Sequence, residues 1–152
     1  MNAKSNLKSI KRLLLIFIIS LAVSGATAMP IDPELQLLLP AVPSHSSAGA
    51  WGHKVLHSYQ AVRQYAPFLL YGYDWLAFAH FVIAILFIGP YKDPVKNSWV
   101  IQFGLIACVL VVPFAMVFGA VRGIPFWWRL IDCSFGVLGF AVLYPCYKKS
   151  KG

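Results

Sequence analysis

Three long apolar segments follow one another between Leu70 and Leu143 of this 152-residue sequence. Each is about as long as the ~20 residues that a helix needs to cross the ~30 Å hydrocarbon core of a membrane. Only 12% of the residues are charged, whereas about a quarter are charged in a typical soluble domain. We therefore expect an all-α membrane protein with a three-helix transmembrane bundle over residues 68–147. The predicted spans are Leu70–Ile88, Trp99–Phe118 and Phe126–Leu143.

The first 28 residues have the pattern of a secretory signal peptide. A basic stretch from Lys4 to Arg12 precedes an apolar run from Leu13 to Val23. Ala26-Thr27-Ala28 then fits the A-x-A pattern of a signal peptidase site. The sequence thus predicts a cleavable signal peptide over residues 1–28. The alternative is that this segment stays uncleaved as a first transmembrane helix.

Two segments of different composition separate this leader from the spans. Residues 29–50 are rich in Pro, Ser and Ala, and we interpret them as an extracytoplasmic linker because prolines interrupt long helices. In residues 51–67, apolar residues such as Trp51, Val55 and Tyr59 recur at helical spacing, and polar residues fall on another face. This second pattern predicts an amphipathic helix that lies in the headgroup layer.

The positions of the basic residues predict an orientation. Lys and Arg are enriched in the cytoplasmic loops of membrane proteins. With residue 29 outside, the Lys92 and Lys96 loop and the basic tail at residues 148–152 both fall in the cytoplasm. We expect a multi-pass protein of a cell membrane, most simply a bacterial inner membrane, with the mature N-terminus outside. Because the basic residues flank spans, nucleic-acid binding is a poor explanation of the positive charge.

Ionisable residues within the spans are candidate functional groups, because charges are costly in hydrocarbon. Asp74 opens the first span, whereas Arg129 and Asp132 open the third. The expected topology puts all three at the outer face, so we expect Asp74 and Arg129 to form a clamp between helices. Arg129 and Asp132 are also three residues apart and can pair along one helix. His80, near mid-span, is expected to be a hydrogen-bonded packing residue, or else an axial haem or metal ligand.

Small residues predict how the spans pack. Gly136 and Gly139 share one face of the third span with Arg129, Asp132 and Leu143. Glycine lets a neighbouring backbone approach closely, and such contacts hold helices together where lipid is as apolar as leucine. The sequence therefore predicts close packing at these two glycines.

Signals for catalysis or metal binding are weak. His53 and His57 are four residues apart and could share a metal ion, but neither a third ligand nor a nearby glutamate accompanies them. The sequence also has no glycine-rich phosphate loop and no G-x-S-x-G motif. We expect neither a catalytic residue nor a cofactor.

These observations favour a small, non-enzymatic subunit or accessory factor of a membrane complex. Its expected partners are the lipid bilayer and another membrane protein or a second copy of itself. One alternative is a small transporter or channel that works as a homo-oligomer, in which the charges at the outer face form a ring. Another is a redox protein that binds haem or a metal through His80, or through His53 and His57.

Overall fold

The computed structural model describes residues 3–150, with side chains from Asn6 onward. Met1 and Asn2 of the predicted signal peptide, and Lys151 and Gly152 of the predicted tail, lie outside the described residues. Within the described range the chain forms helices and no strand, which confirms the all-α prediction. The elements are α1 (Ala3–Ala28), α2 (Ile31–Leu38), η1 (Leu39–Ala41), α3 (Ser47–Tyr65), η2 (Pro67–Leu70), α4 (Tyr71–Leu86), α5 (Ile88–Lys92), α6 (Ser98–Val121) and α7 (Phe126–Ser150).

Among the described residues, four helical segments are long and apolar enough to cross a membrane. Three of them contain the spans that the sequence predicts. The fourth lies in α1, within the predicted signal peptide. These segments are Asn6–Ala28, Pro67–Lys92, Ser98–Val121 and Phe126–Ser150.

The chain divides into two compact units. Unit 1 comprises Met1–Ser20 and Ile83–Gly152, and unit 2 comprises Leu21–Val82. Helices α1 and α4 each contribute to both units. The predicted bundle over residues 68–147 is not confirmed as one body, because residues 68–82 belong to unit 2 and the remainder to unit 1.

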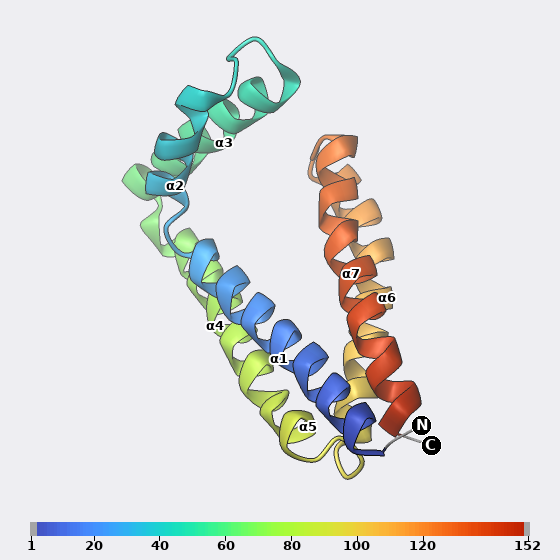
Figure 1. Ribbon diagram of the computed structural model, residues 1–152. Coiled ribbons are helices and arrows are strands. Elements are labelled where there is room, and N and C mark those ends of the chain that lie inside the picture. Colours follow the sequence, from blue (N-terminus) through green and yellow to red (C-terminus); the bar gives the residue numbers. More distant parts are fainter. Residues whose placement is uncertain (1–2, 151–152) are drawn as a thin grey trace. The chain divides into compact units, whose positions relative to one another are not determined.

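The main contact of unit 1 joins α6 and α7, which run side by side (Figure 1). Gly136, Gly139 and Leu143 are buried on one face of α7, as the sequence predicts. A Cβ atom at Gly136 would lie 2.5 Å from the carbonyl oxygen of Cys108, and one at Gly139 would lie 2.7 Å from the Cys108 Sγ. The two glycines therefore let the backbones of α6 and α7 approach closely.

The turn between α6 and α7 stops one helix and starts the next. Gly123 has a φ of 68°, a left-handed conformation that glycine adopts without steric cost. The amide of Gly123 donates to the carbonyl of Ala120 at 3.1 Å, and the amide of Ile124 donates to that of Gly119 at 2.8 Å. This pair of hydrogen bonds is the Schellman motif that ends helices at glycine. Pro125 follows immediately, directly before α7.

Unit 2 contains a short helical hairpin where the sequence predicts a linker. Residues 29–50 form α2, η1 and the first residues of α3, so this region is more ordered than the linker prediction implies. The Ser46 hydroxyl caps α3 by accepting from the amide of Gly49 at 3.0 Å. A Cβ atom at Gly52 would overlap the side chain of Leu39. This contact explains how α3 packs against η1.

Candidate functional site

Arg129 lies one turn into α7, within a candidate span. Its aliphatic stem covers Gly119 of α6, where a Cβ atom would lie 2.5 Å from the Arg129 Cδ. Its NH1 donates to the carbonyl of Met116 at 3.3 Å, and its guanidinium lies 5.3 Å from the ring centre of Phe126. The Nε atom is buried, and no described residue forms a hydrogen bond with it. Glycine at position 119 thus lets a charged group fold back along α6.

Asp132 is one turn further along α7. Within the described part of unit 1, Arg129 and Asp132 do not form the ion pair that their spacing permits. Asp132 instead lines an open groove of about 620 Å³ along α6, with an apolar wall that includes Phe114 and Phe118. Arg122, at the end of α6, also borders the groove. The groove therefore combines one carboxylate and one guanidinium with an apolar wall.

Asp74 lies in the first turn of α4 and belongs to unit 2. It borders a small groove of about 250 Å³ with Tyr71, Trp75 and Phe78. The Tyr71 and Trp75 rings pack edge to face with centres 6.0 Å apart, and so do Trp75 and Phe78 at 5.6 Å. Because Arg129 belongs to unit 1, the clamp between Asp74 and Arg129 stays a prediction.

His80 is half-buried on α4, and its Nδ1 lies 2.8 Å from the carbonyl oxygen of Leu76. A carbonyl can only accept, so Nδ1 carries the proton in this contact. In the neutral imidazole, Nε2 is then left as the acceptor. Nδ1 thus has its hydrogen-bond partner within the helix. Nε2 is the atom that would bind the iron or metal ion in the predicted alternative.

His53 and His57 lie on α3, and both are exposed. They remain two histidines without a third ligand, because residues 3–150 hold no cluster of three His, Cys, Asp or Glu side chains that could bind a metal ion. A shared metal at this pair stays a prediction.

The sequence does not predict the polar cluster around Asp32, because the composition of residues 29–50 favours a linker. Asp32 is buried on α2 and accepts from Gln36 Nε2 at 2.7 Å, from Gln60 Nε2 at 3.2 Å and from Arg63 NH1 at 2.9 Å. The hydrogen bond from Gln36 is the largest influence that holds the pKa of Asp32 below its usual value. Burial opposes it, while Gln60 and Arg63 act in the same direction. The four-residue spacing of Asp32 and Gln36 was the only local signal.

This cluster predicts a local pH dependence. The pKa of Asp32 is lowered by folding, so its stabilising effect is present above the unfolded pKa of about 3.9 and is lost as the pH falls through the folded pKa. We expect amide hydrogen exchange in α2, corrected for intrinsic rates, to rise below about pH 4. Asp32→Asn should show fast exchange at neutral pH and no acid step. Glu34→Gln, which changes the other acidic residue of α2, should keep the step, and its loss in that variant would contradict the assignment.

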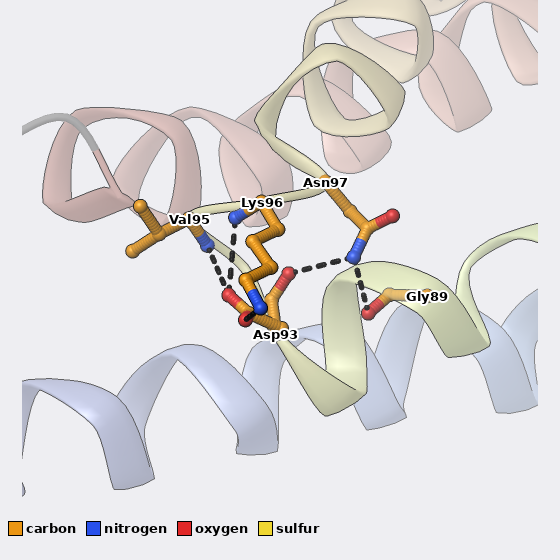
Figure 2. Close-up of polar contacts among 5 residues, drawn as sticks. All are labelled: Gly89, Asp93, Val95, Lys96 and Asn97. Atoms are coloured by element: carbon orange, nitrogen blue, oxygen red, sulfur yellow. Dashed lines mark hydrogen bonds and ion pairs between the residues drawn. The ribbon is translucent and has the colours of Figure 1, made fainter.

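A second polar cluster forms the loop between α5 and α6 (Figure 2). The Asp93 carboxylate accepts from the amides of Val95 at 3.1 Å and Lys96 at 3.0 Å. The Asn97 side-chain amide donates to the carbonyls of Gly89 at 3.2 Å and Asp93 at 2.9 Å. These hydrogen bonds hold the loop in one conformation. Their donors are backbone amides and the Asn97 side chain, not the side chains of Lys92 and Lys96.

Comparison of the chain with protein-family models, with curated proteins and with solved structures finds no match. The candidate site is a small set of charged groups on apolar helices, namely Asp74, Arg129 and Asp132.

Proposed function

We propose that this chain is a non-enzymatic subunit or accessory factor of a membrane complex. The observation that supports it best is Arg129, a guanidinium within a candidate span that donates to the carbonyl of Met116 and forms no ion pair with a described residue of unit 1. A charge in a low-dielectric environment needs an anionic partner. Asp74, at the start of α4, is the partner that the expected topology supplies, and a carboxylate on a neighbouring protein would serve equally.

The orientation that follows from the basic residues is part of this proposal. The loop that contains Lys92 and Lys96 and the end of α7 lie in the cytoplasm, and the Arg122 turn lies outside. The α2–α3 hairpin is then outside, where α3 lies along the headgroups. A bacterial inner membrane is the location we propose.

The contacts of α1 favour the alternative to a cleaved signal peptide. Ile10 and Leu14 are buried, at 3% and 0% exposed, and Phe17 packs on Phe87 with ring centres 4.7 Å apart. In unit 2, a Cβ atom at Gly25 would lie 2.9 Å from the carbonyl oxygen of Ala77. We propose that α1 is retained as the first of four transmembrane helices. Because the basic residues in the first turns of α1 stay inside in both cases, the orientation does not change.

Native mass spectrometry of the detergent-extracted protein tests these proposals together. We expect a chain of full length, bound in fixed stoichiometry to a different membrane protein. Arg129→Ala should lose that partner, whereas Lys54→Gln on exposed α3 should keep it. A chain that begins at Met29 would show that residues 1–28 are cleaved as a signal peptide. A chain that never binds a second protein would refute the subunit proposal.

The α6–α7 groove favours a second candidate, a homo-oligomeric transporter or channel. A carboxylate that borders an open groove within a span is the type of group that ion pathways use, and Asp132 holds that position. Four helices are few for a solute path, so this function requires several copies. A discrete homo-oligomer in the same mass measurement would favour it, and an absorbance band near that of haem would favour a redox role for His80.

A further inference from the structure

Three segments far apart in the sequence meet at one end of unit 1. The Cys146 Sγ of α7 contacts the carbonyl of Ile10 in α1 at 3.8 Å, and the Lys149 Nζ donates to the Ser9 hydroxyl at 3.4 Å. The Lys11 ammonium lies 5.7 Å from the ring centre of Tyr91 in α5. Figure 1 shows the first turns of α1 beside the last turns of α7. We call this region the basic end.

The basic end gathers positive charge from all three segments. Every one of its basic side chains except Lys11, which is half-buried, is exposed. Lys96 is the clearest case, with 85% of its side chain exposed. The basic side chains are Lys8, Lys11, Arg12, Lys92, Lys96, Lys148 and Lys149.

The acidic side chain next to these basic groups is Asp93, and it does little to neutralise them. Asp93 is occupied by the amides of Val95 and Lys96 within its own loop (Figure 2). Its ion pair with the Lys96 Nζ is long, at 3.9 Å, and an exposed pair of this kind contributes little energy. The loop is thus held in shape while the basic end keeps a strong positive charge.

Exposed apolar side chains begin immediately beside these charges. Val95 and Trp99 are 64% and 62% exposed next to Lys96, and Tyr144 is 50% exposed one turn before Lys148. An occupant that satisfies both parts of this surface needs a negative head and an apolar body. A free nucleic acid or free phosphate has only the first of these properties.

We propose that the basic end binds the phosphate headgroups of acidic phospholipids in the leaflet that it faces. This inference rests on the proposed membrane insertion of the chain, and it adds a defined ligand class to it. Each Lys or Arg near an anionic membrane surface strengthens binding by about fivefold. The composite surface depends on α1, since three of its basic side chains come from that helix.

The test measures lipid binding to the full chain in detergent by native mass spectrometry. Short-chain phosphatidylglycerol is the anionic probe and short-chain phosphatidylcholine the neutral one. We expect phosphatidylglycerol to bind more than tenfold more tightly, with a preference that falls as salt is raised. Lys92→Gln with Lys96→Gln should weaken phosphatidylglycerol binding by about 25-fold, and Lys148→Gln with Lys149→Gln should act similarly. Lys92→Arg with Lys96→Arg should retain phosphatidylglycerol binding, because the charge is kept.

Lys54→Gln is the matched control, because Lys54 is an exposed lysine of α3 in unit 2. It should leave the preference unchanged, and circular dichroism should show the same helix content for every variant. Equal affinity for the two lipids, or an equal loss in Lys54→Gln, would overturn the inference. Competition by inorganic phosphate at matched concentration would also overturn it, because the site would then be a phosphate site. A protein that keeps its partner but shows no lipid preference refutes this inference alone, whereas one that fails to insert refutes the proposed function.

Discussion

Gly136→Leu should separate α6 from α7 and lower the free energy of unfolding by about 3 kcal/mol. The first side-chain atom added at this position would meet the carbonyl oxygen of Cys108 at 2.5 Å. That neighbour is backbone, so no rotamer change can move it away, and the whole helix has to shift. Unfolding in mixed micelles of mild detergent and sodium dodecyl sulfate would measure the loss.

Gly72→Leu provides the matched control for this experiment. Gly72 also lies in a candidate span, but a Cβ atom there would meet nothing within 4 Å. Leucine has the better helix propensity, by under ~1 kcal/mol, so this variant should be neutral or slightly more stable. If the two variants lose the same stability, the contact between α6 and α7 is not what holds unit 1 together.

Arg129→Ala should destabilise the protein by about 3 kcal/mol if the guanidinium pairs with Asp74 as proposed, because an unpaired carboxylate would remain within a candidate span. Asp74→Asn should cause a comparable loss of stability, because the Arg129 guanidinium would then be unpaired. The double variant should lose clearly less than the sum, since the second change removes a charge that is already unpaired. Unfolding in mixed micelles of all four proteins completes the cycle.

Arg122→Ala is the appropriate comparison, because Arg122 is exposed at the end of α6 and should contribute little. Strict additivity of the two losses would show that Asp74 and Arg129 do not interact. Full stability in both single variants together with loss of the partner protein would assign the charges to the interface with that partner.

The spans could be predicted from the sequence because length and apolar composition alone determine them. The face of α7 that packs on α6 could also be predicted, since Gly136 and Gly139 lie at helical spacing and are buried as expected. Local signals of this kind do not depend on the rest of the fold.

The contacts of Asp32 could not be predicted in the same way. Gln60 and Arg63 are 28 and 31 residues away from it, and the prolines around α2 indicate interruption instead of packing. The groove beside Asp132 was missed for a related reason. It depends on how side chains of α6 line up against α7, whereas the sequence indicates only that the two helices are apolar.

The contact between Ile10 and Cys146 also determines when unit 1 can be completed. A ribosome adds about 5–20 residues per second, so α1 is synthesised roughly ten seconds before the last turn of α7 exists. During that interval the carbonyl of Ile10 lacks the contact that the Cys146 Sγ makes in the complete chain. The N-terminal helix is therefore the first part of unit 1 to be made and among the last to find its final contacts, and a chain that stops before Cys146 leaves this surface open.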